Sequence, residues 1–187
     1  MNRTGNVVVA ALAALALTLS TASLMAETDP EVGGAAMFPT KNIVENAVNS
    51  QDHTTLVAAV KAAGLVDTLE GAGPFTVFAP VNAAFDKLPA GTVDTLLKPE
   101  NKDQLVKVLT YHVVAGKVSS ADLVKMIKKG HGKAELKTVE GGTLTASLMG
   151  GKVMLADEKG GMSTVTIADV YQSNGVIHVV DSVLLPN

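Results

Sequence analysis

The chain has 187 residues, a formal net charge of −3 at pH 7 and no cysteine. Disulfides and lipid attachment at a cysteine are therefore excluded, and this mildly acidic composition does not favour nucleic-acid binding. Only four Phe, two Tyr and no Trp are present, so aliphatic side chains must fill the core. The roughly 160 residues that follow a targeting segment suit a single domain that folds unaided.

The N-terminal segment has the pattern of a secretory signal peptide. Arg3 provides a positive charge, Val7–Leu19 form an apolar run, and a short polar stretch leads to Ala26. We predict a signal peptide over residues 1–26, cleaved after Ala26, with cleavage after Ser23 as the alternative. The apolar run is shorter than the roughly 20 residues needed to span a bilayer. We therefore expect an exported, periplasmic or extracellular chain without a transmembrane segment after cleavage.

The front half of the chain is predicted to be mostly helical. Residues 27–39 lack periodicity and contain two glycines and two prolines, which predicts a flexible leader before a domain over residues 40–187. Thr40 can cap a first helix, and a second helix has apolar residues at helical spacing from Leu56 to Ala63, with Gly64 as its stop.

A strand and three helices should follow. Phe75–Ala79 has the Phe, Thr and Val content of a strand. Asn82 then opens a short helix, in which its side-chain oxygen can accept from N–H groups of the first turn. Thr92 can cap another helix, and Pro99–Leu109 predicts a longer one.

The back half is predicted to be an antiparallel meander. Tyr111–Gly116 should form a short strand, and Ser119 with Asp122 should form a capping box at the start of a helix that stops at Gly130. Five β-prone segments follow from Lys133 onward, separated by glycine-rich turns. The pairs Gly150-Gly151 and Asn174-Gly175 suit the positive φ angles of tight hairpins.

No catalytic or metal-binding pattern is visible. The four histidines, His53, His112, His131 and His178, do not stand at the spacing that places two zinc ligands on one helix face. A nucleophile elbow, a phosphate-binding loop and a dinucleotide-binding glycine motif are all missing from the sequence. We therefore predict no catalytic residue, no cofactor site and no metal site.

A basic cluster lies near the end of the helix that precedes the meander. Lys125, Lys128, Lys129 and Lys133 surround His131. Two interpretations stand: a solvated helix end, or a patch for anionic polysaccharide or lipid headgroups.

The Tyr111-His112 pair also has two interpretations. Two residues that enter a strand place their side chains on opposite faces, so the inward group needs a buried hydrogen-bond partner, which a polar group near Asn82 or His178 could supply. The pair is then structural. The other interpretation is contact with a partner.

Three segments together resemble the fasciclin-like (FAS1) domain family. Thr76–Phe85 is similar to the first conserved box of the family, Asn174–Pro186 to the second, and Tyr111-His112 to the motif between them. The similarity covers Lys41–Pro186. The resemblance implies an α+β domain in which a helical front half packs with an antiparallel β-wedge or sandwich.

The resemblance also implies roles for individual residues. It implies a structural role for nine motif positions: Thr76, Phe78, Pro80, Asn82, Phe85, Asn174, Gly175, His178 and Asp181. In animal relatives the Tyr-His region is implicated in integrin-mediated adhesion, which maps onto Tyr111, His112, Val113 and Val114 as candidate partner-binding residues.

The leading hypothesis is a secreted, non-enzymatic module for cell adhesion or surface interaction. Its partner would be a cell-surface or matrix protein or a polysaccharide. The alternative is a soluble envelope protein that binds a small apolar or anionic ligand beside the Lys125–Lys133 cluster, and a hydrolase is the third hypothesis.

Overall fold

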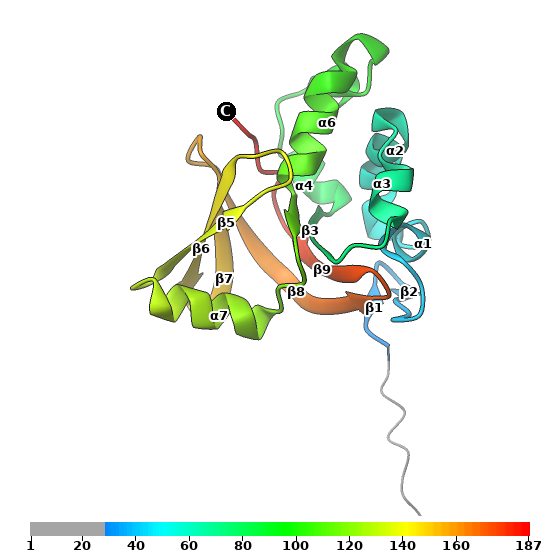
Figure 1. Cartoon of the computed structure of the whole chain (residues 1–187). Helices are drawn as coiled ribbons and strands as arrows, with labels where there is room; N and C mark the ends of the chain where they lie inside the picture. Colours follow the sequence, from blue (N-terminus) through cyan, green and yellow to red (C-terminus); the bar gives the residue numbers. More distant parts are fainter. Residues whose placement is uncertain (1–28) are drawn as a thin grey trace, which may run out of the picture.

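The computed structural model describes residues 29–187, and the predicted signal peptide lies outside this range (Figure 1). The α-helices are α1 (Ile43–Ala47), α2 (Thr54–Ala63), α3 (Val66–Glu70), α4 (Asn82–Asp86), α5 (Thr92–Leu96), α6 (Lys102–Tyr111) and α7 (Ser120–Lys129), with 3-10 turns at Gln51–His53 and Pro99–Asn101. The strands are β1 (Glu31–Val32), β2 (Ala35–Ala36), β3 (Phe75–Pro80), β4 (Val113–Ala115), β5 (Lys133–Lys137), β6 (Thr143–Met149), β7 (Lys152–Ala156), β8 (Met162–Gln172) and β9 (Gly175–Val180).

Seven strands form one curved sheet in the order β4-β3-β9-β8-β7-β6-β5. All neighbours are antiparallel except β3 and β9, which are parallel. The pairing of β8 with β9 shifts register twice, and such irregularities bend a strand. An isolated bridge joins Val114 to Thr138, so the β4 edge approaches the end of β5 and the sheet forms a wedge that almost closes (Figure 1).

Two hydrophobic cores lie on opposite faces of the central strands. Side chains alternate along a strand, so Val77 and Val179 face the helices, and Phe78 and Val180 face the inside of the wedge. The helical core is built from α1, α2, α3 and α6 against β3 and β9. The wedge core is closed by α7, which packs against β5, β6 and β7. The molecule is an α+β domain with helices grouped against one part of a mostly antiparallel sheet, as predicted.

Several local predictions are confirmed. Gly64 ends α2 with a φ of 71°, and Ser119 and Asp122 form the capping box of α7. Gly150 and Gly151 have positive φ angles in the β6–β7 turn.

The prediction of a flexible leader is wrong for the part that the structure describes. β1 and β2 form a hairpin in which Val32 and Met37 are buried in the helical core. Asn46 fixes this segment, because its side chain exchanges two hydrogen bonds with the backbone of Phe38, at 2.8 and 3.1 Å. The folded unit therefore begins before Thr40. Two buried apolar side chains are enough to pack the hairpin against the helical core, but two are too few to produce a periodic pattern in the sequence.

The caps of the first helices also differ from prediction. Asn42, not Thr40, caps α1 and forms a capping box with Glu45. At α5 the cap position is Gly91, and Thr92 is the first helical residue.

Candidate functional site

The predicted contact residues Tyr111 to Val114 are not on the surface. Tyr111 ends α6, His112 caps it, and β4 begins only at Val113. The exposed fractions of Tyr111, His112, Val113 and Val114 are 0%, 2%, 6% and 5%. The prediction that these four side chains touch a partner is wrong for this fold. Tyr111 and His112 are not in a strand, so they do not divide between two faces, and both point into the domain.

Tyr111 joins the helical half to the meander. Its hydroxyl donates to Thr143 O at 2.8 Å and accepts from Glu158 N–H at 3.3 Å. Burial raises the pKa of Tyr111 to about 12, although the hydrogen bond from Glu158 acts in the opposite direction. A Cβ on Gly142 would lie 2.7 Å from the Tyr111 ring, so the ring fits only beside a residue without a side chain.

His112 joins α6 to the C-terminal segment. Its Nε2 accepts from Leu184 N–H at 3.0 Å, which leaves Nδ1 to donate to Val108 O at 2.8 Å. The ring is therefore neutral, with its proton on Nδ1. Burial lowers the pKa of His112, although the Val108 carbonyl favours the protonated form. The predicted partner near Asn82 or His178 is wrong, since both partners of His112 are backbone groups.

His178 and Thr76 fasten the loop between β4 and α7. His178 donates from Nε2 to Val118 O at 2.8 Å and accepts Asp169 N–H on Nδ1 at 3.3 Å. Thr76 Oγ1 donates to Gly116 O at 2.7 Å and accepts from Val118 N–H at 2.9 Å. Burial lowers the pKa of His178. Both polar side chains are satisfied internally on the central strands.

Asn82 stabilises a different helix from the one predicted. Val81 is the cap of α4 and Asn82 is its first residue. The Asn82 Oδ1 accepts from Thr55 N–H at 3.0 Å in the first turn of α2, and its Nδ2 donates to Gln51 O at 2.7 Å. Asn82 thus caps α2 across a chain separation that local sequence patterns do not reveal.

Asn174, just before β9, also binds backbone groups of distant helices. Its Oδ1 accepts from Ile43 N–H at 3.0 Å, and its Nδ2 donates to Leu69 O at 2.7 Å and Gly71 O at 2.9 Å. The Asn174-Gly175 pair does not have the predicted positive φ angles. Gly175 is needed for a close approach instead, because a Cβ there would lie 2.1 Å from Phe75 O.

The remaining motif positions are packing residues or hydrogen-bond acceptors. Phe78 stacks on His178 inside the wedge, with ring centroids 5.6 Å apart. Pro80 is buried at the end of β3, and Phe85 belongs to the helical core.

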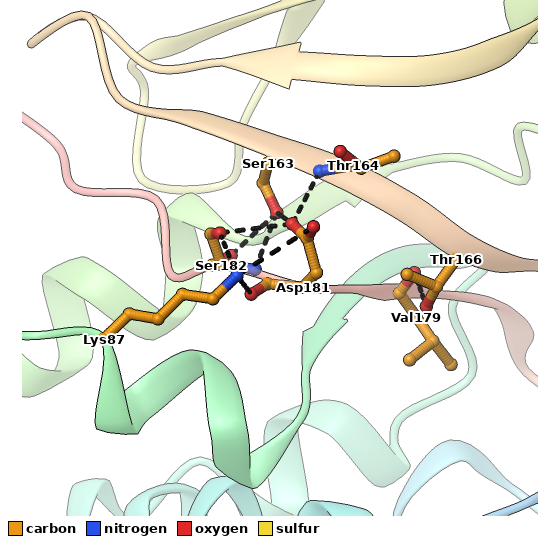
Figure 2. A network of polar contacts seen from close by, with 7 residues as sticks. All are labelled: Lys87, Ser163, Thr164, Thr166, Val179, Asp181 and Ser182. Atoms are coloured by element: carbon orange, nitrogen blue, oxygen red, sulfur yellow. Dashed lines mark hydrogen bonds and ion pairs between the residues drawn. The ribbon is translucent and has the colours of Figure 1, made fainter. Parts of the chain in front are cut away.

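Asp181 holds the end of β9 against β8, as Figure 2 shows. Its Oδ1 accepts from Thr164 N–H at 2.8 Å and from Ser182 Oγ at 3.1 Å, and Lys87 Nζ donates to the Asp181 carbonyl at 2.6 Å. Ser163 Oγ accepts from Ser182 N–H at 3.0 Å. Burial acts to raise the pKa of Asp181, but the hydrogen bonds and the Lys87 ammonium outweigh it and hold the pKa below its ordinary value. These contacts leave Ser163 buried and engaged, so the cluster is a structural joint.

We call the hydrogen-bonded motif residues the motif joint: Thr76, Asn82, Tyr111, His112, Asn174, His178 and Asp181. Its members come from β3, α4, α6, β9 and the turns beside them. Each one connects segments that are distant in sequence. The motif joint therefore holds the two halves of the domain together through hydrogen bonds.

No sequence pattern points to the roles of Asn46 and Lys152, and His53 is considered in the sequence only as one of four histidines without a zinc spacing. Asn46 secures the N-terminal hairpin. His53 is buried, with Nδ1 at 2.9 Å from Ser50 Oγ and no hydrogen-bond partner on Nε2, and burial lowers its pKa. Lys152 lies on β7 beside the predicted lysine cluster. The three-residue spacing of Ser50 and His53 is a pattern from which their side-chain contact could be predicted. The position of Lys152 follows only from strand register.

The described residues offer little space for a ligand in their interior. Three hollows in the helical half have volumes of ≈ 40, ≈ 30 and ≈ 30 Å³, whereas small-molecule pockets are typically about 300–1,000 Å³. Among residues 29–187, no group of three or more His, Asp or Glu side chains is arranged to hold a metal ion. No helix in the same range is long and apolar enough to cross a membrane.

Comparisons with known proteins agree with the fold. A family model described as the fasciclin domain matches residues 51–186. Protein sll1483 of Synechocystis sp. is 51% identical over 160 residues, which cover 86% of this chain and 82% of that protein. The cell surface glycolipoprotein MPB83 of Mycobacterium bovis is 37% identical over 160 residues, which cover 83% of this chain and 64% of that protein.

A solved structure has the same architecture. It is a FAS1 domain pair from the insect cell adhesion molecule Fasciclin I, with a TM-score of 0.69 and 20% sequence identity. The match covers 78% of this chain and 51% of the solved chain, so the protein spans about half of that chain. At this identity the likeness shows the fold.

Proposed function

Because the chain belongs to the fasciclin domain family, we propose that it is an exported, non-enzymatic module for adhesion or surface interaction. The observation that carries the proposal is the state of the motif joint. Its polar side chains are hydrogen-bonded within the domain, and none of them is arranged as a nucleophile beside a free base. A domain of this kind acts through its exterior. A cell surface relative and an adhesion-molecule structural neighbour support this role.

Export is the first part of the proposal. The charged start, the apolar run and the small residue at Ala26 support a signal peptide over residues 1–26. N-terminal sequencing of the protein recovered outside the cytoplasm tests it. A start at Glu27 is expected, a start at Leu24 marks the alternative site, and retention of residues 1–26 in the cytoplasm would contradict export.

Surface interaction is the second part. A single domain has no avidity of its own, but a coated surface presents many copies and restores it. The test uses the chain from Glu27, which retains every residue that the structure describes. Cells and purified matrix components are applied to surfaces coated with this protein, and the same protein coated after irreversible unfolding is the control.

We expect retention on the folded protein and at least a severalfold lower signal on the unfolded control. Equal retention on both coatings, or none across cells, matrix proteins and polysaccharides, would remove the proposal. If the purified protein hydrolysed ester or glycoside substrates and Ser163→Ala abolished this activity, the hydrolase hypothesis would be favoured instead.

A further inference from the structure

One end of the wedge brings together three segments that are separate in the sequence. Lys133 pairs with Ser147 at the start of β5, and Met149 pairs with Lys152 beside the Gly150-Gly151 turn. The loop that follows α7 leads directly into Lys133, so it lies beside that turn. We call this end of the domain the basic corner: Met126, Lys128, Lys129, Lys133, Leu148, Met149 and Lys152. Figure 1 shows α7 lying along β5, β6 and β7 at this end.

The basic corner has more lysines than carboxylates, since Glu135 is the acidic residue in the hollow beside Lys129 and Lys133. Lys128, Lys129, Lys133 and Lys152 are all exposed, and across residues 29–187 no ion pair within 4.0 Å involves any of them. The negative end of the α7 dipole accounts for Lys128 and Lys129 in the last turn. It does not account for Lys133 and Lys152, which lie on strands. Positive charge thus gathers here on a chain whose net charge is −3.

Exposed apolar side chains lie on both faces of this end of the sheet: Leu148 is on the wedge face with its partner Val153, and Met149 is on the opposite face with its partner Lys152. Met149 is 59% exposed, Met126 39% and Leu148 36%. Because the turn itself consists of two glycines, Met149 and Leu148 are the apolar side chains nearest to the tip. Met126, Lys129 and Lys133 also line an open hollow of ≈ 550 Å³ beside β5, whose rim includes Glu135. Met126, Leu148 and Met149 thus leave apolar surface exposed in the region of the four lysines.

We propose that the basic corner docks on an anionic phospholipid membrane. This inference rests on the proposed function and specifies an anionic membrane as the surface that the protein contacts. Lysine ammonium groups are attracted to acidic headgroups, and apolar side chains beside them can enter the boundary of the acyl chains. A polyanionic polysaccharide would need the lysines but would gain nothing from Met149 and Leu148. The combination of charge and exposed apolar tip therefore favours a membrane.

The test is co-sedimentation of the chain from Glu27 with vesicles of mixed phosphatidylglycerol and phosphatidylcholine, and with vesicles of phosphatidylcholine alone. Binding should require phosphatidylglycerol and weaken between about 0.1 and 1 M salt. Lys129→Gln/Lys133→Gln/Lys152→Gln should lower the partition coefficient about a hundredfold, from about fivefold for each lysine near an acidic membrane.

Two variants make the result specific. Lys61→Gln/Lys98→Gln/Lys102→Gln removes the same charge from exposed lysines of the helical half and should leave binding within about twofold of wild type. Leu148→Ser/Met149→Ser keeps all the lysines and should weaken binding at least tenfold. Circular dichroism confirms that each variant is folded.

Three results would overturn the proposal. They are equal loss in both lysine triples, full binding by the Leu148/Met149 variant, and no binding to vesicles that contain phosphatidylglycerol. Retention of cells in the coated-surface assay despite failure with vesicles would leave the proposed function intact and remove only the membrane as its target. Failure of both the cell-retention assay and the vesicle assay would remove the proposed function and the membrane-docking proposal together.

Discussion

The motif joint and the basic corner differ in almost every physical respect. The polar groups of the joint are hydrogen-bonded to backbone or side chains of the same domain, and its aromatic and imidazole rings are buried. The corner is exposed, and within residues 29–187 its four lysines form no ion pair within 4.0 Å. Residues that identify the family build the fold, whereas the surface available to a partner lies outside the motifs.

The largest expected effect is in the motif joint. His112→Ala removes the partners of Val108 O and Leu184 N–H and leaves a cavity, which should lower the free energy of unfolding by about 3–4 kcal/mol. Tyr111→Phe keeps the ring and loses one hydroxyl, so about 1–2 kcal/mol is expected. Urea unfolding measures both. Equal stability of wild type and His112→Ala would show that the joint is not structural.

Acidification should act on the same region. Burial lowers the pKa values of His53, His112 and His178 below the ordinary value of 6.5, so below pH 6.5 the unfolded chain binds more protons than the folded one. The free energy of unfolding should therefore be fully maintained above pH 6.5 and should fall by up to about 1 kcal/mol per histidine between pH 6.5 and 5.5.

One variant separates the contribution of a buried histidine from that of the carboxylates. His178→Phe should make the decline between pH 6.5 and 5.5 shallower, because one buried imidazole is removed. A wild-type stability that rises on acidification through this range would contradict the neutral, buried state of the three rings.

A smaller effect is expected at Asn82. Asn82→Ala removes the acceptor of Thr55 N–H and the donor to Gln51 O, and should cost about 1–2 kcal/mol. Asn82→Asp keeps the acceptor for α2 and should recover part of the loss. Thermal unfolding followed by circular dichroism distinguishes them. If Asn82→Asp, which keeps the acceptor for Thr55 N–H, recovered none of the loss, the assignment of the cap to α2 would be wrong.

The smallest effect is expected in the basic corner. Lys129→Gln/Lys133→Gln/Lys152→Gln touches no internal hydrogen bond, so the free energy of unfolding should change by less than about 0.5 kcal/mol. Chemical unfolding of this triple beside Tyr111→Phe compares the two regions directly. A loss above that of Tyr111→Phe would show that the corner also holds the fold together.

The sequence predicted elements where local chemistry decides them. The capping box at Ser119 and the glycine end of α2 depend on a few adjacent residues, and both are confirmed. Long-range pairing decides what the sequence could not predict. Asn82 caps a helix 27 residues earlier in the chain, and Lys152 and Lys133 come to the same end of the sheet only through the register of β5, β6 and β7.

The Tyr111-His112 pair lies where a local sequence pattern is ambiguous. A helix and a strand meet at these residues, and the strand propensity of the next residues hid the last turn of α6. Tyr111 and His112 are both buried because the wedge almost closes. No local sequence pattern predicts that closure. The structural role of His112 could be anticipated from the cost of burying imidazole, but its backbone partners could not.

The most direct test compares cell retention on surfaces coated with wild type, with folded Tyr111→Phe, and with the Lys129/Lys133/Lys152 glutamine triple, at equal coating density. Tyr111→Phe removes the polar group of the family motif without emptying its site. Full retention is expected on Tyr111→Phe, and strongly reduced retention on the triple. Loss on folded Tyr111→Phe together with full retention on the triple would contradict it and return the contact surface to the motif.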